Sequence, residues 1–132
     1  MDIRVKDIMS APVTVALIED NILEIRTLMK EKGIHAIPIV SCTNDTIKVE
    51  ETLKGIITSN DINEEISDDA TIEDVMTTIP IHVVHVDSSV KSAAKAMLKH
   101  HVHHIVVMDD GEIKGMISSL DFVKLIAEHN LE

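Results

Sequence analysis

Two short motifs in the sequence combine a hydroxyl group and a carboxylate at the same spacing. They read GIITSND in the first half of the chain and GMISSLD in the second. Thr58 and Ser118 carry hydroxyls, and Asp61 and Asp121 follow three residues later. We expect a strand to end and a helix to begin in both motifs, which leaves backbone N–H groups that favour an anion. Such a hydroxyl with free N–H groups can hold a phosphate or carboxylate, and an ionised Asp can accept both hydroxyls of a ribose.

The same residues have a simpler interpretation as helix caps. Ser, Thr and Asp side chains commonly accept hydrogen bonds from the first N–H groups of a helix. Position alone favours capping over ligand binding. One residue can do both, so the two interpretations stay open.

Four histidines lie within five residues in the stretch KHHVHHIVV. We expect His100 and His101 to end a helix, and His103 and His104 to begin a strand and so to point to opposite faces. Zinc needs three or four ligands that converge tetrahedrally. We therefore expect no metal site within one chain. A site shared across a dimer, or with the histidines of 82–85, stays an alternative.

Both motifs close a unit that occurs twice in the chain, and such repeats indicate two related folding units. VKDIM is echoed by IEDVM, APVTVALIEDNI by IPIHVVHVDSSV, and IHAIPIV by VHHIVVM. Each copy predicts the order β–α–β–β–α. We expect a first helix after the cap candidates Asp20/Asn21 or Asp87/Ser88, ending near Gly33 or His101. The expected strands are 13–18, 36–40 and 53–58 in the first copy and 81–86, 104–108 and 112–118 in the second. A last helix should start near Asn60 or Leu120.

The repeats define the expected domain organisation. Residues 1–66 form the first repeat and residues 67–132 the second, joined by the polar segment 67–71. A unit of about 60 residues buries so little surface that its stability alone is marginal. We therefore predict an α/β (α+β) fold in which two β-α-β-β-α repeats pack sheet to sheet with pseudo-twofold symmetry and form clefts at the axis.

The composition argues against some classes of partner and indicates a cell compartment. The chain has one Phe and no Trp or Tyr, so Ile, Val, Leu, Met and Ala must build the core. A formal net charge of −11 argues against nucleic acid and anionic membranes as partners. The single cysteine, Cys42, excludes an internal disulfide and fits a reduced cytoplasmic setting. We see no signal peptide and no run of about 18 apolar residues.

These motifs resemble the CBS domain, named after cystathionine β-synthase, in its tandem form, the Bateman module. The resemblance covers about residues 5–128. It rests on DIM and DVM, on Pro12 and Pro80, on GIHAIPIV and HVHHIVV, and above all on the two motifs GIITSND and GMISSLD. Such modules are usually regulatory, and many bind AMP, ADP, ATP or S-adenosylmethionine in clefts between the repeats. The resemblance implies a stand-alone module that pairs with itself as a homodimer or with a regulated enzyme or transporter.

The resemblance also assigns roles to residues. Asp61 and Asp121 would bind the ribose. The phosphate or polar side would be formed by Thr58, Ser118, Ser119, His35, His103 and His104. The base side would be formed by Val13, Val15, Ala36, Ile81 and Val83, for which ordinary core packing is the alternative. Relatives that bind AMP often have His-Arg where this chain has His35-Ala36 and His103-His104. Without that permanent charge, a monophosphate or a cationic nucleoside is easier to hold than a triphosphate.

The sequence shows no arrangement typical of a catalyst. Ser118 and Ser119 are explained by the repeat, and Cys42 has no basic neighbour in sequence. We therefore expect no enzymatic activity. A ligand-sensing regulatory module is the first hypothesis. A ligand-free scaffold for dimerisation or interaction, or less favourably a metal-binding histidine cluster, is the alternative.

Overall fold

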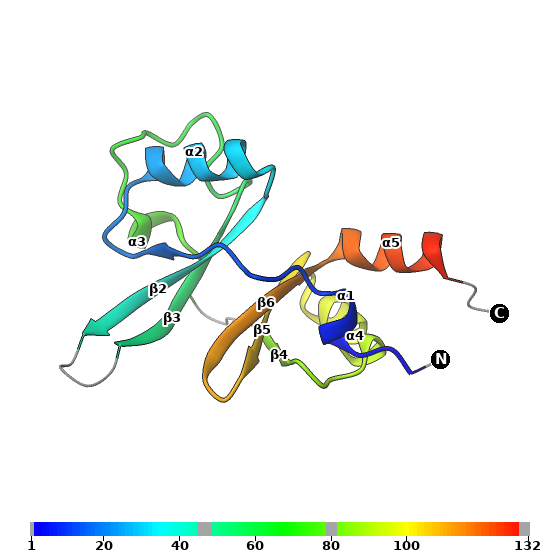
Figure 1. The fold of residues 1–132 in the computed structure, drawn as a ribbon. Coiled ribbons are helices and arrows are strands. Elements are labelled where there is room, and N and C mark those ends of the chain that lie inside the picture. Colours follow the sequence, from blue (N-terminus) through cyan, green and yellow to red (C-terminus); the bar gives the residue numbers. More distant parts are fainter. Residues whose placement is uncertain (1, 45–48, 79–81, 130–132) are drawn as a thin grey trace. The chain divides into compact units, whose positions relative to one another are not determined.

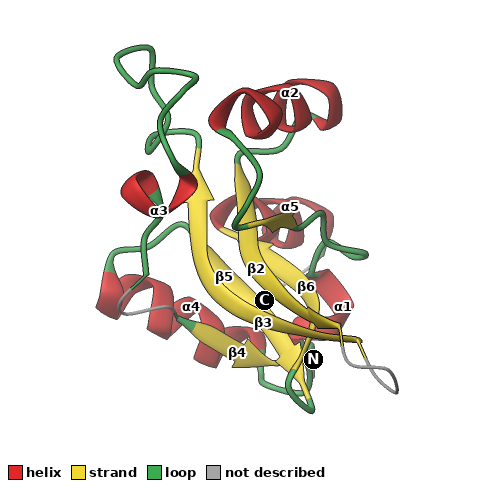
Figure 2. Ribbon diagram, turned by 90° about the vertical axis from the view of Figure 1, so that its left-hand side faces the viewer, coloured by secondary structure: helices red, strands yellow, loops and turns green. Residues whose placement is uncertain are grey.

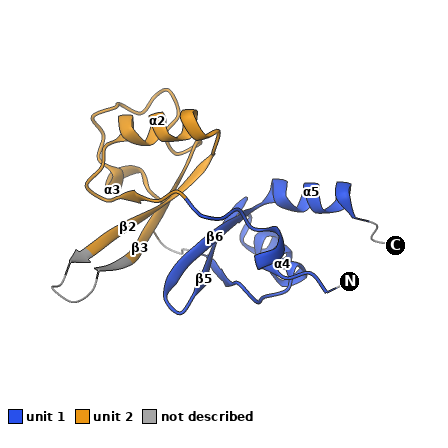
Figure 3. Cartoon of the chain, viewed as in Figure 1, with its two compact units in different colours: residues 1–13, 82–132 blue, residues 14–81 orange. Residues whose placement is uncertain are grey.

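The computed structural model describes residues 2–44, 49–78 and 82–129. The chain divides into two compact units (Figure 3). Residues 14–81 form the first-repeat unit, and residues 1–13 with 82–132 form the second-repeat unit. Each unit holds its own three-stranded sheet and its own apolar cluster. The mixed α+β fold class predicted from the sequence is confirmed.

The first-repeat unit is built on a sheet with the strand order β1–β2–β3 (Figure 1). β1 runs parallel to β2, and β2 pairs antiparallel with β3 in a long ribbon (Figure 2). The elements are β1 (Ala16–Leu17), α2 (Ile22–Lys32), β2 (Ala36–Asn44), β3 (Val49–Thr58) and α3 (Ile72–Val75). This ribbon is longer than the one formed by β5 (His104–Asp109) and β6 (Glu112–Ser118) in the second repeat, and its turn at 45–48 lies outside the described residues.

The second-repeat unit repeats this topology with the strand order β4–β5–β6. β4 is parallel to β5, and β5 is antiparallel to β6. The elements are α1 (Val5–Ile8), β4 (Val83–His85), α4 (Val90–His100), β5 (His104–Asp109), β6 (Glu112–Ser118) and α5 (Ser119–Glu128). The order β–α–β–β–α is therefore present, although β1 and β4 are shorter than the predicted strands 13–18 and 81–86.

Short branched aliphatic side chains build both cores. In the first-repeat unit Ile25 of α2 packs with Ile37 and Ile57 of the sheet, and all three are fully buried. In the second-repeat unit Ala93 of α4 packs with Ile117 of β6. Branched side chains suit strands, where they pack on the pleated surface. Burial of this apolar surface is what holds each helix on its sheet.

Helices α2 and α4 start and stop through equivalent devices. Asn21 Oδ1 accepts the Glu24 N–H at 2.9 Å, and Ser89 Oγ accepts the Ser92 N–H at 3.1 Å. The prediction of Asn21 is confirmed, whereas the second helix is capped by Ser89 and not by Asp87 or Ser88. Both helices end in a left-handed residue, Gly33 with φ 63° and His101 with φ 54°. The predicted equivalence of these two positions is confirmed.

One predicted element is absent. A last helix starts at Ser119, as expected near Leu120, but the segment after Thr58 forms turns instead of a helix near Asn60. Its side chains compete for the backbone: Asn63 Oδ1 accepts the Glu65 N–H at 2.9 Å, and Ser67 Oγ accepts the Asp69 N–H at 3.1 Å. Asn and Ser side chains that bond their own backbone offer an alternative to the helical ladder.

The helical turns that open each sequence repeat pack against the sheet of the other repeat. Ser10 exchanges two backbone hydrogen bonds with Met116 of β6, at 2.8 and 3.0 Å. Thr77 does the same with Ile56 of β3, at 3.0 and 2.9 Å. The opening segment of the first sequence repeat therefore belongs to the second-repeat unit, and the opening segment of the second sequence repeat belongs to the first-repeat unit.

Candidate functional site

The ends of β3 and β6 carry equivalent hydroxyl and carboxylate pairs. The Thr58 N–H and hydroxyl both donate to Asp61 Oδ2, at 2.8 and 3.1 Å. The Ser118 N–H and hydroxyl donate to Asp121 Oδ2 at 2.8 and 3.2 Å. Each Asp therefore accepts two hydrogen bonds at a strand end, but the predicted helix capping is found only at Asp121, because turns and no helix follow Thr58. At Asp121 this forms a reciprocal capping box at the start of α5.

The sheet brings the histidine positions to the same strand ends. Ala36 pairs in register with Thr58, and His104 pairs with Ser118. One residue further along the chain, the two strand ends are also joined by a backbone hydrogen bond, from the Ser119 N–H to the His103 carbonyl at 3.0 Å. The Ser59 N–H donates in the same way to the His35 carbonyl at 2.8 Å. The start of β2 or β5 and the end of β3 or β6 thus form one half-site in each unit.

Capping occupies only one oxygen of each carboxylate. Both hydrogen bonds at Asp61 and at Asp121 converge on Oδ2. Within the described residues, no side chain or backbone donor is hydrogen-bonded to Oδ1 of either Asp. Both residues are half-buried, so the second oxygen stays available at the surface. A carboxylate in this state can accept a hydroxyl of a ligand while it continues to cap.

Two glycines let the backbone cross closely behind the half-sites, which the sequence did not reveal. A Cβ at Gly115 would lie 2.7 Å from the Ser10 carbonyl oxygen and from the Met9 sulfur. A Cβ at Gly55 would lie 2.8 Å from the Thr77 carbonyl oxygen. The first residue of each motif is thus required by the crossing segment. The repeated DIM and DVM sequences could have indicated this close contact, because their methionines, Met9 and Met76, pack against Gly115 and Gly55.

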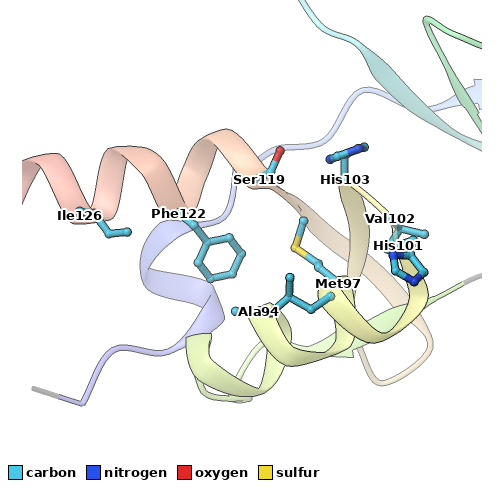
Figure 4. Close-up of a pocket in the computed structure, with 9 residues that line it drawn as sticks. Ala94, Met97, His101, Val102, His103, Ser119, Phe122 and Ile126 are labelled. Carbon is cyan, nitrogen blue, oxygen red and sulfur yellow. The ribbon is translucent and has the colours of Figure 1, made fainter.

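A pocket of about 620 Å³ lies in the second-repeat unit between α4 and α5 (Figure 4). Ser119 and His103 stand at one end of it, with His101 nearby on the C-terminal side of α4. The remaining lining is apolar: Ala94, Met97, Leu98, Val102, Phe122 and Ile126. Asp121 and Ser118 are not among the lining residues. This pocket therefore includes only part of the half-site and is mainly an apolar groove between two helices.

The predicted base-side residues are placed in different environments. Ala36 is buried, whereas Val83 on β4 is 48% exposed. Val13 and Val15 are half-buried and belong to different compact units. Ile81 lies outside the described residues. Their role at a ligand stays a prediction.

Three histidines of the second-repeat unit have close side-chain partners. The rings of His82 and His100 stack with their centroids 3.9 Å apart. The pKa of His100 is lowered below its ordinary value, first by partial desolvation and then by the positive charges of His82 and Lys99 nearby. His85 Nε2 lies 3.0 Å from an oxygen of Asp109. In the described part of the chain no three His, Cys, Asp or Glu side chains come together as a metal site.

The comparisons with known proteins agree with this geometry. The family model for the CBS domain matches residues 5–68 and again residues 72–128. Among solved structures, the CBS domain pair of protein MJ0100 in complex with 5′-methylthioadenosine and S-adenosyl-L-methionine is 31% identical. It superposes with a TM-score of 0.82 and covers 96% of this chain and 98% of that one. The CBS domain of a membrane protein from Sphaerobacter thermophilus is 26% identical, with a TM-score of 0.76, and covers 95% of this chain and 88% of that one.

A curated relative is similar to this chain over part of a much longer protein. Inosine-5′-monophosphate dehydrogenase of Staphylococcus aureus is 29% identical over 108 residues, which is 82% of this chain and 21% of that enzyme. The chain thus spans about a fifth of the length of the curated relatives it matches. None of the helices in the described ranges is long and apolar enough to cross a membrane. Two successive matches to one family model, on two units of equal topology, establish that the chain belongs to the CBS domain family as a tandem pair.

Proposed function

We propose that this CBS pair is a non-catalytic regulatory module that binds an adenosyl ligand in clefts between its repeats. Asp61 and Asp121 would accept the ribose hydroxyls. Thr58, Ser118, Ser119, His35, His103 and His104 would form the polar side, and Val13, Val15, Ala36, Ile81 and Val83 the base side. The similar pair that carries 5′-methylthioadenosine and S-adenosyl-L-methionine supports this class of ligand. Such ligands fit a cytoplasmic protein.

The observation that carries the proposal is the unused oxygen on each capping carboxylate. Asp61 and Asp121 are fixed by two donors on Oδ2 and keep Oδ1 at the surface. A preorganised acceptor of this kind loses little freedom when a ligand binds. The net charge of −11 favours a cationic nucleoside or a monophosphate over a triphosphate.

The test is calorimetric titration and thermal unfolding with AMP, ADP, ATP and S-adenosylmethionine. A ligand present at about 100 times its dissociation constant should add about 2.7 kcal/mol to the free energy of unfolding. Asp121→Asn is the informative variant, because its amide oxygen can still cap while its NH₂ cannot accept a hydroxyl. We expect the variant to keep its unfolding temperature without ligand and to lose affinity. Unchanged affinity in both Asp61→Asn and Asp121→Asn would refute the site.

Homodimerisation through α4 and α5 is the second part of the proposal, and an exposed apolar surface favours it. Leu98, Leu120, Val123 and Ile126 are 76%, 72%, 60% and 65% exposed. A surface of this kind is typical of a protein interface. An enzyme or transporter that contacts the dimer would be the regulated partner.

Light scattering after gel filtration tests the dimer. Val123→Glu should produce monomers, because a charge would be buried without a partner in the interface. Leu23→Glu on α2, where Leu23 is 53% exposed, is the matched control and should stay dimeric. If Val123→Glu stays dimeric, the interface lies elsewhere. If the dimer forms but no adenosyl compound binds, the module is a ligand-free scaffold.

A further inference from the structure

The fifth residue of the long helix differs between the repeats, and the space beside that helix differs with it. α2 begins at Ile22 and α4 at Val90, so Arg26 and Ala94 occupy equivalent positions. Ala94 lines the open groove between α4 and α5 (Figure 4). Arg26 instead extends from α2 to the turn segment 59–68, which stands where the second repeat has α5. At this position the first repeat therefore has a guanidinium where the second repeat has a methyl group beside the groove.

The guanidinium of Arg26 holds the backbone of this turn segment at several points. It donates to the carbonyl oxygens of Asn63 at 2.9 Å, Ile66 at 2.5 Å and Ile62 at 3.3 Å. It also forms an ion pair with the carboxylate of Asp68. In a helix such carbonyls would accept from N–H groups four residues later. The Asn63 carbonyl also accepts the Ile66 N–H at 3.0 Å, so Arg26 supplies from another element part of the donors that a helix would supply from itself.

Asp61 lies directly before the first of these carbonyls. On its N-terminal side it is fixed by the two donors of Thr58, and on its C-terminal side the chain is fixed by the bond from Arg26 to Ile62. Ile62 itself is buried in the core of the first-repeat unit. Asp121, in contrast, is held within the first turn of α5 by the regular helix. The two carboxylates therefore reach equivalent positions by different means.

We propose that Arg26 is a positioning residue for the ligand-binding carboxylate Asp61, and that it replaces in the first repeat the support that α5 gives to Asp121. This inference rests on the proposed function, because it assumes that Asp61 contacts the ligand. Arg is suited to this role since its planar guanidinium has five N–H donors and stays charged. All three carbonyls lie near one guanidinium nitrogen, Nη2, while Nη1 contacts the carboxylate of Asp68, and the single nitrogen of lysine cannot reproduce this division. The two half-sites consequently differ in what maintains them.

The experiment measures each half-site separately. Asp121→Asn leaves the first half-site as the reporter, and Asp61→Asn leaves the second, with binding of AMP and of S-adenosylmethionine measured by calorimetry. Adding Arg26→Ala should weaken binding at the first half-site by about tenfold or more and leave the second unchanged. Arg26→Lys should restore part of the loss. Backbone amides of 62–68 should exchange hydrogen faster in Arg26→Ala, with little change in α5.

Ile25→Val is the matched control for a merely structural effect. Ile25 is the neighbouring, fully buried residue of α2, and its truncation lowers stability without touching the guanidinium contacts. It should bind as tightly as the parent at both half-sites. Equal affinity of Arg26→Ala and Ile25→Val at the first half-site would overturn the inference, and so would an equal loss at both half-sites. Unchanged binding in Asp61→Asn would instead refute the proposed site itself. If Arg26→Ala fails to fold, Arg26→Lys decides the question by the same comparison.

Discussion

The two repeats share a topology but differ in how the end of the last strand is supported. In the second repeat the chain continues from Ser118 into α5, and a groove stays open beside Ala94. In the first repeat the chain continues from Thr58 into turns, and Arg26 of α2 donates hydrogen bonds to the carbonyls of those turns. Both arrangements keep the carboxylate 2.8 Å from the backbone N–H at the strand end. The half-site is thus conserved in geometry while its outer support has been replaced.

This difference separates two tasks that a repeat can perform. The half-site depends on the strand end and the carboxylate, which the repeats have in common. The exposed apolar surface depends on α5, which only the second repeat provides within the described residues. We therefore expect substitutions in the shared sheets to act alike in both repeats, and substitutions near α5 or Arg26 to act in one repeat only.

Truncation of the equivalent core residues should give the largest losses. Ile57 and Ile117 are both fully buried, in β3 and β6. Ile57→Ala and Ile117→Ala should each lower the free energy of unfolding by about 2–5 kcal/mol, because each leaves a cavity in its cluster. Urea unfolding followed by circular dichroism measures the losses. A loss confined to one variant would mean that the two cores do not contribute equally.

A methyl group added at Gly55 or Gly115 should lower the free energy of unfolding by less than the core truncations do, and by similar amounts in the two repeats. Gly55→Ala and Gly115→Ala would place Cβ 2.8 and 2.7 Å from a backbone carbonyl oxygen. Such overpacking should lower stability by about 1–3 kcal/mol. Thermal unfolding of the two variants gives the comparison. If either variant is as stable as the parent, the crossing segment is free to shift away from that sheet.

Exchange of the helix C-cap residues should change stability in opposite directions. Gly33 and His101 both have positive φ, which glycine adopts without strain. His101→Gly should therefore raise the free energy of unfolding by about 0.5–1 kcal/mol, and Gly33→Ala should lower it by a similar amount. Chemical unfolding midpoints of the two variants measure this. A stabilising effect of Gly33→Ala would contradict the left-handed geometry of that cap.

The stacked imidazoles should give the smallest effect, a pH dependence found in the second repeat alone. His82 and His100 correspond to Thr14 and Lys32 in the first repeat, which therefore lacks the pair. Because the folded pKa of His100 is lowered, the folded state binds fewer protons than the unfolded state. The stability is full above the unfolded pKa of about 6.5 and falls as the pH drops through the lowered folded pKa.

Unfolding midpoints at about pH 7.5 and about pH 5.5 measure this dependence. His100→Gln should reduce the loss of stability at the lower pH, while His103→Gln serves as a control outside the stack. An identical pH dependence in His100→Gln and the parent would show that other groups cause it.

Local signals accounted for most of the fold. The apolar runs at 36–40 and 104–108 predicted buried strands, and Gly33 predicted the end of α2, because these features depend on neighbours in sequence. For the segment after Thr58 the same kind of signal gave a wrong prediction, a helix near Asn60. Ile62 and Ile66 have helical spacing, but Asn63 and Ser67 bond the local backbone instead.

The half-sites show the same limit of local reasoning. The spacing of Asp61 and Asp121 to a hydroxyl marked them as candidates, and in the structure they accept hydrogen bonds from Thr58 and Ser118. Their role at a ligand stays a prediction. The role of Arg26 could not be identified, because its partners lie 36 or more residues away in sequence. Only its contrast with Ala94 in the aligned repeats marked the position as unusual.

Residue types and short-range spacing were enough to predict the duplication, all elements of each copy except the last one of the first copy, and the hydroxyl and carboxylate pairs at the strand ends. The tertiary structure decided which sheet each opening segment covers, why the motif glycines are needed, and how the first repeat manages without its last helix. Those features depend on contacts between residues far apart in the chain. Such contacts form only when the whole unit folds, so no local pattern can specify them.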